Sequence, residues 1–271
     1  MSLHNTPKKA DSQEKNHQTK GLFPFWKKPG ETLATMLRRF REEHNLGSDE
    51  KLTYAGRLDP MAEGIVPILS GEARFQKERF MNRSKTYEVE VLLGIGTDTG
   101  DMLGLATPNV ILSQAKGDVF VKQGVTKIEK ALEIIRQTVS LPYPNYSSIP
   151  VDGKPLFVHA RAGNKVVLPI KKVKIYDLEL LSIKERKFSD LVAESVAVIE
   201  KVEGDFRQQE IIAQWEDMER EYGNETVQIV TIRTTVSSGT YMRAIAEKLG
   251  LLLKMPALAY GIKRISIEGM Q

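Results

Sequence analysis

Apolar residues recur along the chain at two spacings, one typical of strands and one typical of helices. The clearest strand pattern lies at 87–93, where every second residue is apolar: Tyr87, Val89, Val91 and Leu93. A period of two predicts a strand with one buried face and one solvated face. Similar patterns and short apolar runs predict further strands over 172–181, 192–200, 227–234 and 262–267.

Apolar residues three or four positions apart predict four helices. These segments are 31–44, 128–139, 205–222 and 237–250. The segment 205–222 carries many charges, and we interpret it as a helix inserted between two strands, where it covers a sheet edge or contacts a partner. Residues 105–126 lack periodicity, and 141–157 are rich in Pro, Gly and Tyr, which is typical of an extended loop.

Strands and helices do not alternate regularly, so the chain is expected to have an α+β fold with a mainly antiparallel or mixed central sheet flanked by helices. One domain is expected over 21–271, because no linker-like stretch interrupts it. Residues 1–20 are polar and mixed in charge, without the apolar segment of a secretory signal. We expect them to form a disordered tail.

Composition excludes several kinds of site. The chain has no cysteine, so disulfides and thiolate nucleophiles are excluded, and its four histidines are not spaced as metal ligands. No apolar run is long enough to span a membrane. The formal charge of +4 permits a nucleic-acid partner without requiring one. We expect a cytoplasmic monomer that holds no metal.

The stretch TYAGRLDPMAEGIVPILSGEARF, residues 53–75, carries the first candidate for chemistry. Asp59 lies between Leu58 and Pro60, and the proline keeps the residue before it out of the helical region. The carboxylate therefore has a defined direction against the apolar run that follows, as a catalytic acid requires. A turn in which this acid only caps the backbone is the alternative.

A glycine-rich segment, GIGTDTGD, follows the strand at 87–93 and holds a second acid, Asp98. Its glycines miss the dinucleotide-binding spacing by one position, and it lacks the lysine of a phosphate loop. Asp98, Thr99 and Gly100 spell the aspartic-protease triplet, but that chemistry needs two carboxylates, so a protease would have to be a symmetric dimer. A strand-ending turn in which Asp98 bonds to its own loop is the favoured interpretation.

Four separated segments agree in order and spacing with one known family. They are GRLDPMAEG with PILSGEARF, KTYEVEVLLGIGTDTGD, PNYSSIPVDGKPLF with HARAG, and SSGTYMRAIAEKLG. Together they resemble the TruB family of tRNA pseudouridine synthases, and the LDPxAxG and GTYxR motifs are the most specific parts. The resemblance implies a cofactor-free isomerase that breaks the glycosidic bond of a uridine in RNA and rejoins the base through carbon 5. The T-loop uridine of tRNA is the expected substrate.

The resemblance also implies a role for each residue of the site. Asp59 would be the essential carboxylate, which either attacks covalently or removes a proton. Tyr87 matches a tyrosine that stacks on the everted base, and Arg243 matches an arginine that holds the acid in its ionised form. Tyr241 would line the pocket, and Ile262 would pack on the base.

The chain departs from the family pattern near this pocket. Tyr54 stands in place of a histidine, Arg57 in place of a smaller residue, Lys27 in place of an aspartate and Pro150 in place of a lysine. We still expect Tyr54 and, in the KKPG segment, Lys28 to bind substrate. The departures motivate an alternative, a non-catalytic RNA-binding or folding factor on the same scaffold. We expect no C-terminal RNA-binding domain, so affinity for tRNA would depend on the basic surface and on salt.

Overall fold

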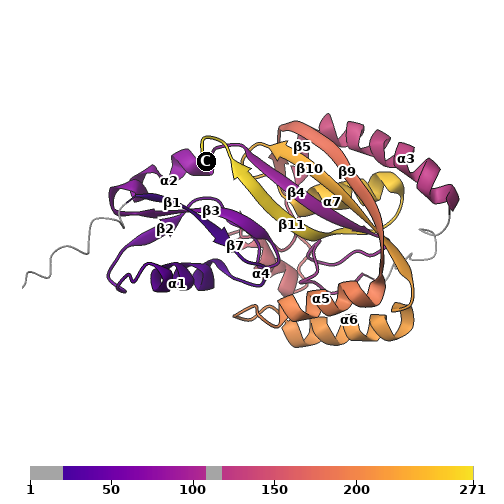
Figure 1. Cartoon of the computed structure of the whole chain (residues 1–271), viewed down its shortest axis with the longest axis horizontal. Coiled ribbons are helices and arrows are strands. Elements are labelled where there is room, and N and C mark those ends of the chain that lie inside the picture. The colour runs from indigo at the N-terminus through magenta and orange to yellow at the C-terminus, as the bar shows by residue number, and fades with distance from the viewer. Residues whose placement is uncertain (1–20, 108–117, 271) are drawn as a thin grey trace, which may run out of the picture.

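A mixed sheet of seven strands is the central element of the computed structural model, which describes residues 21–107 and 118–270 (Figure 1). In space the strands follow the order β1 (Leu22–Lys27), β3 (Glu63–Ser70), β11 (Ala257–Ile267), β4 (Lys85–Leu93), β10 (Thr226–Val236) and β9 (Ile175–Lys187), with β2 (Leu52–Tyr54) on β3. Neighbouring strands are antiparallel except for β3 and β11, which run parallel. The predicted α+β class with a mainly antiparallel sheet is confirmed.

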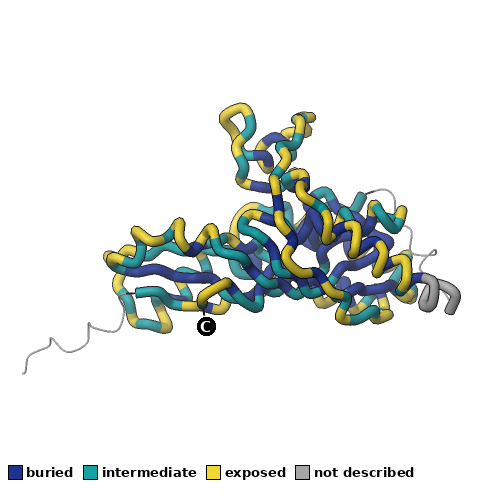
Figure 2. The backbone as a smooth tube through the Cα atoms, turned by 90° about the horizontal axis from the view of Figure 1, so that it is seen from above, coloured by how far each residue is buried: buried dark blue, intermediate teal, exposed yellow. Residues whose placement is uncertain are grey.

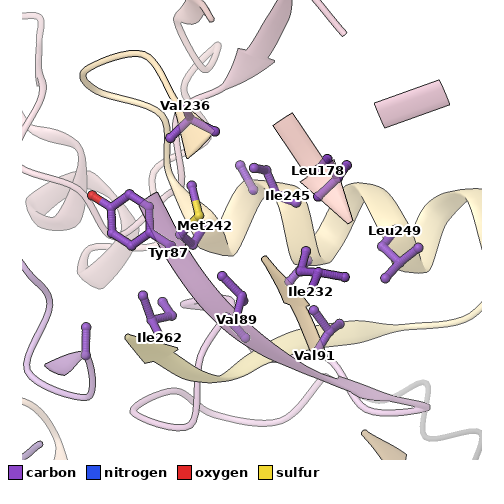
Figure 3. Packing of buried hydrophobic residues seen from close by; sticks show 14 of the residues in the cluster. Tyr87, Val89, Val91, Leu178, Ile232, Val236, Met242, Ile245, Leu249 and Ile262 are labelled. Carbon is purple, nitrogen blue, oxygen red and sulfur yellow. The ribbon is translucent and has the colours of Figure 1, made fainter. Parts of the chain in front are cut away.

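Two helices, α7 (Met242–Leu253) and α3 (Asp118–Arg136), cover one face of this sheet. Alternate residues of β4 and β10 point toward α7, so that Val91 and Ile232 share one core with Ile245 and Leu249 (Figure 3). The strand predicted at 87–93 is therefore confirmed as β4, with its apolar face buried. Burial of this face against a helical stripe is what the two spacings require.

A helical hairpin covers the opposite face. It consists of α5 (Phe188–Ile199) and α6 (Gln208–Tyr222), which lie side by side beneath the sheet in Figure 1. Phe188 and Trp215 are fully buried, with ring centroids 6.2 Å apart. Thus α6 matches the helix predicted over 205–222, whereas the strand predicted over 192–200 is wrong. Buried residues recur in α5 at helical spacing: Phe188, Leu191, Val192, Ser195 and Ile199.

Most of the other predicted elements are confirmed. The helices predicted at 31–44, 128–139 and 237–250 correspond to α1 (Leu33–Glu43), α3 and α7. The strands predicted at 227–234 and 262–267 correspond to β10 and β11, and 172–181 falls mainly in β9. Two short helices, η1 (Gly71–Gln76) and α2 (Lys77–Met81), connect β3 to β4. Residues 105–126 are not irregular throughout, because α3 begins at Asp118. The tail 1–20 lies outside the described residues.

An arm of mostly exposed residues leaves the body between α3 and β9. It contains β5 (Ser140–Pro142), β6 (Pro150–Val151), β7 (Lys154–Pro155), α4 (Leu156–Arg161) and β8 (Ile170–Lys172). Figure 2 shows this arm projecting from the body, with exposed segments at its tip. Because β5 pairs with β8 and β6 pairs with β7, the extended loop predicted over 141–157 is only partly correct.

Candidate active site

A cavity of about 610 Å³ lies where the loop after β2 faces β4 and the start of α7. Five residues singled out from the sequence line it: Asp59, Tyr87, Tyr241, Arg243 and Ile262. They come from the loop after β2, from β4, from the N-terminal end of α7 and from β11. The fold thus brings together side chains from four segments that are well separated in the sequence.

A buried ammonium group holds the loop that carries Asp59. Lys27 Nζ donates to the carbonyl oxygens of Pro60 at 3.0 Å and Ala62 at 2.6 Å, on the C-terminal side of the acid. Burial lowers the pKa of Lys27 to about 8, although the charges of Glu31 and Asp59 oppose this shift. The ammonium is therefore still mostly protonated at neutral pH, and its hydrogen bonds fix the course of the loop.

A buried guanidinium holds the same loop from its N-terminal side. Arg264 is 1% exposed and donates to the carbonyl oxygens of Gly56 at 3.0 Å and Arg57 at 3.3 Å. Its Nε donates to the carbonyl of Ile65 at 2.7 Å, where β11 pairs with β3 in parallel. This close approach of the two strands requires Gly64, which has a φ of +122° and whose added Cβ would lie 2.3 Å from the Arg264 carbonyl oxygen. Asp59 therefore projects from a loop that is restrained at both ends.

The catalytic candidate Asp59 is paired with a buried arginine. Arg243 Nε lies 2.9 Å from Asp59 Oδ2, and the side chain of Asp59 is 36% exposed whereas that of Arg243 is 4% exposed. Arg243 Nη1 donates to the Thr99 carbonyl at 2.6 Å, and Nη2 donates to the Tyr146 carbonyl at 3.1 Å. Burial alone would lower the pKa of Arg243, but the carboxylates of Asp59 and Asp101 raise it overall. The guanidinium is thus charged and held beside Asp59 by two backbone carbonyls.

A second carboxylate, Asp101, lies behind this ion pair. Its Oδ2 is 3.8 Å from Arg243 Nε, and its Oδ1 accepts hydrogen bonds from Thr99 Oγ1 at 2.8 Å and from the Leu103 amide at 3.0 Å. Burial raises the pKa of Asp101 to about 6, Arg243 opposes this shift, and the charge of Asp59 adds to it. One guanidinium therefore lies beside two carboxylates that both line the cavity, and Asp59 is by far the more exposed of the two.

Tyr87 and Ile262 form part of the apolar wall of the cavity. Both are mostly buried, and they lie next to each other on β4 and β11, with Met242 of α7 beside them (Figure 3). The Tyr87 hydroxyl points away from the other labelled side chains in that view. Tyr241, whose ring centroid lies 6.0 Å from the Arg243 guanidinium carbon, continues this wall. Flat apolar surfaces of this kind can hold a nucleobase by its faces.

Two of the expected substrate-binding residues lie elsewhere. Tyr54 is in β2 with its ring 5.4 Å from the Lys77 ammonium, and Lys28 is exposed in the turn after β1. Neither lines the cavity. The buried lysine of the KKPG segment is Lys27, and it contacts the Asp59 loop and not open space. The alternation of β1, in which Phe25 and Lys27 point inward, is the signal that distinguishes the two lysines.

Sequence interpretation missed three residues that support the site: Lys27 as a loop anchor, Arg264 and Asp101. Arg264 has a signal in the sequence, because it is two positions after Ile262 in a strand and so shares its face. Asp101 has no such signal beyond its place as the last residue of the glycine-rich segment GIGTDTGD.

Asp98 is bonded to its own loop, as expected. Its Oδ1 accepts from the Leu105 amide at 2.8 Å, and its Oδ2 is paired with Arg207 Nη1 at 2.8 Å. Both oxygens are engaged, so the free carboxylate that the protease hypothesis requires is not present at this position.

Within residues 21–107 and 118–270, no three His, Asp or Glu side chains are grouped closely enough to hold a metal ion. No helix in the same residues has the length and apolar character needed to cross a membrane.

Comparison with known proteins is consistent with this geometry. A family model described as TruB family pseudouridylate synthase (N terminal domain) matches residues 44–198, more than half of the chain. The chain belongs to the TruB family. The matched region contains Asp59, Tyr87 and Asp101 of the cavity but ends before Arg243.

Relatives of this TruB family member include two proteins named tRNA pseudouridine synthase B. The one from Azoarcus is 36% identical over 143 residues, which are 51% of this chain and 43% of that protein. The one from Cupriavidus metallidurans is 30% identical over 221 residues, which are 80% of this chain and 54% of that protein. The chain thus spans about half the length of the curated relatives it matches.

A solved structure supports the fold assignment. The crystal structure of a Cbf5-Nop10-Gar1 complex contains a chain that aligns with a TM-score of 0.53 at 17% identity, over 91% of this chain and 48% of that one. At this identity the likeness concerns the fold alone.

Proposed function

We propose that this TruB family member converts uridine in RNA to pseudouridine. The observation that carries the proposal is the pairing of Asp59 with Arg243 at 2.9 Å inside the cavity of about 610 Å³. This volume lies within the range of ligand pockets, roughly 300–1,000 Å³. Asp59 is the accessible member of the pair, so a bound base can reach it while the arginine holds it from behind.

The proposed reaction balances without any added reagent. The bond between uracil N1 and ribose C1′ breaks, the base turns, and a bond forms between uracil C5 and C1′. The hydrogen on C5 leaves as a proton, and N1 gains one. A single carboxylate can serve this sequence, either as a nucleophile or as the base that removes a proton.

The other cavity residues would hold the base during the turn. Tyr87 and Ile262 offer apolar surfaces for the faces of a uracil that has left the RNA stack. Arg243 would keep Asp59 oriented throughout, because its own position is set by two backbone carbonyls.

The proposed substrate is tRNA, with its T-loop uridine as the target. Two observations favour tRNA as the substrate. The relatives named above are tRNA pseudouridine synthases by name. In addition, Arg57 and Arg161 lie at the cavity, and the exposed residues Lys172 and Lys174 lie close to the arm's base, where they can contact phosphates.

The test is to incubate the purified chain with an unmodified tRNA transcript and to map pseudouridine by carbodiimide labelling. We expect one labelled site, in the T-loop, for the wild-type chain and none for Asp59→Asn. Asp177→Asn is the control, because Asp177 is exposed on β9 and does not line the cavity. Tight tRNA binding without any product would reject the proposal in favour of a non-catalytic RNA-binding factor.

A further inference from the structure

The α5–α6 hairpin forms a long connection between two strands, β9 and β10, that are direct neighbours in the sheet. Lys187 at the end of β9 is paired directly with Thr226 at the start of β10. The connection formed by residues 188–225 therefore begins and ends at the same pair of residues in the sheet. A short turn could make this connection. The hairpin packs on the back of the sheet, and its tip, residues 200–207, reaches the cavity, where Asp205, Phe206 and Arg207 contribute to the lining.

Ion pairs fasten this tip to two separate parts of the chain. Glu203 is paired with Arg38 of α1, and Asp205 is paired with Arg161 of α4 at 3.1 Å. These pairs are largely exposed, so each contributes little to stability by itself. Their effect is to keep the tip in one place beside the cavity.

Arg207 makes a different set of contacts. It has a φ of +62°, in the left-handed region that residues other than glycine rarely adopt. Its Nη1 is paired with Asp98 Oδ2 at 2.8 Å, and its guanidinium carbon lies 4.7 Å from the centroid of the Tyr146 ring. The side chains of Arg207 and Asp98 are 20% and 30% exposed, so this contact is more sheltered than the other two. Arg207 thus joins the glycine-rich turn to the arm.

These two segments are the ones that orient the catalytic arginine. Arg243 donates to the carbonyl of Thr99, the residue after Asp98, and to the carbonyl of Tyr146 itself. Arg207 therefore touches both of the segments whose carbonyls hold the guanidinium of Arg243 beside Asp59. It lies outside that guanidinium's own contacts, so its effect is indirect.

We propose that Arg207 is a positioning residue, which holds the Thr99 and Tyr146 carbonyls in place and through them keeps Arg243 beside Asp59. The inference rests on the proposed function, because it assigns Arg207 a part in the same reaction. The helical hairpin is then an element that completes the active site from the back of the sheet.

The first test compares Arg207→Ala, Arg207→Lys and Glu203→Gln with the wild-type chain on an unmodified tRNA transcript. For Arg207→Ala we expect kcat to fall about tenfold while KM stays within about twofold, because the carboxylate is misaligned but the apolar wall is intact. Arg207→Lys keeps the charge beside Asp98 and should recover part of kcat. Glu203→Gln loosens the same tip without touching Asp98 or Tyr146, and should leave both constants unchanged.

The second test needs no turnover. The groups that face Asp101 are Arg243 and Glu247 of α7, Asp59, Thr99 and the Leu103 amide. Arg243 is the largest of the influences that oppose the effect of burial on the pKa of Asp101, and the hydrogen bonds from Thr99 and Leu103 act in the same direction. If the Arg243 guanidinium is displaced, the pKa of Asp101 rises, and an NMR titration that follows the Asp101 carboxyl carbon detects the rise. We expect a rise above about 6 in Arg207→Ala and no change in Glu203→Gln.

The outcomes separate the two proposals. Unchanged kcat together with an unchanged pKa of Asp101 in Arg207→Ala overturns the positioning role, whatever the wild-type activity. An equal loss of kcat in Glu203→Gln also overturns it, since a loosened tip would then suffice. A wild-type chain without product, combined with the expected rise in the pKa of Asp101, rejects the proposed function and leaves the coupling between Arg207 and Arg243 intact.

Discussion

Replacing Asp101 with asparagine is expected to stabilise the folded chain at neutral pH. Burial raises the pKa of Asp101 from 3.8 to about 6 on folding. Between these values the folded chain holds a proton that the unfolded chain has lost, so the free energy of unfolding falls as pH rises through this window. The full difference corresponds to on the order of 3 kcal/mol at pH 7. Asparagine is uncharged, so the variant does not bury a carboxylate charge on folding. Its side-chain oxygen can still accept the hydrogen bonds from Thr99 and Leu103.

The assay is urea unfolding of the wild-type chain and Asp101→Asn from about pH 4 to about pH 8. We expect the variant to be more stable by on the order of 3 kcal/mol at neutral pH, with a gap that closes near pH 4. Asp177→Asn, an exposed acid on β9, should show no such gap. The same variant should turn over more slowly, because Arg243 loses one of its two carboxylates. A gap that does not change with pH, or a less stable variant at neutral pH, would refute the reasoning.

Three further predictions concern the cavity and its support. Arg243→Lys keeps the charge but loses the hydrogen bonds that the guanidinium donates to the Thr99 and Tyr146 carbonyls. It should lower kcat by about 100-fold, because hydrogen bonds to charged groups are worth about 1.5–3 kcal/mol each. Tyr87→Ala should lower kcat/KM by about 10- to 100-fold through lost stacking, worth about 1–3 kcal/mol, whereas Tyr87→Phe should stay within a few-fold. Lys27→Met leaves the Pro60 and Ala62 carbonyls without their donor and should lower the free energy of unfolding by about 2–4 kcal/mol in urea. Lys28→Met is the control for Lys27→Met, because Lys28 is exposed, and it should change the free energy of unfolding by less than about 0.5 kcal/mol.

Much of the fold could be predicted because its elements carry a single clear period. The strand at 87–93 alternates strictly, and α7 shows one apolar stripe, so each buries the face that the pattern indicates. The segment 192–200 misled because it is rich in valine, which favours strands in isolation. Its contacts with Trp215 of α6 decide in favour of a helix, and such contacts between distant residues cannot be read from a local pattern.

The site residues were likewise predicted where a clear sequence pattern was used and missed where it was not. Motif resemblance was enough to select Asp59, Tyr87, Arg243 and Ile262, and all four line one cavity. The choice of Lys28 over Lys27 depended on the motif and ignored the alternation of β1, which turns Lys27 inward.

The contacts by which Arg264 and Arg207 hold the site from outside could not be predicted, although the spacing from Ile262 indicates which face of β11 Arg264 shares. Arg264 crosses to the Asp59 loop only because β3 and β11 meet there, and Arg207 approaches the cavity only because α5 and α6 fold back beneath the sheet. Both depend on topology, which no local pattern encodes.

The central claim is that Asp59 isomerises a uridine in RNA, and release of the C5 hydrogen tests it most directly. A tRNA transcript that carries tritium at C5 of its uridines loses one tritium to water for each pseudouridine formed. We predict stoichiometric release from one uridine per transcript with the wild-type chain and none with Asp59→Asn. Release by Asp59→Asn at the wild-type rate, or none by the wild-type chain, would contradict the account.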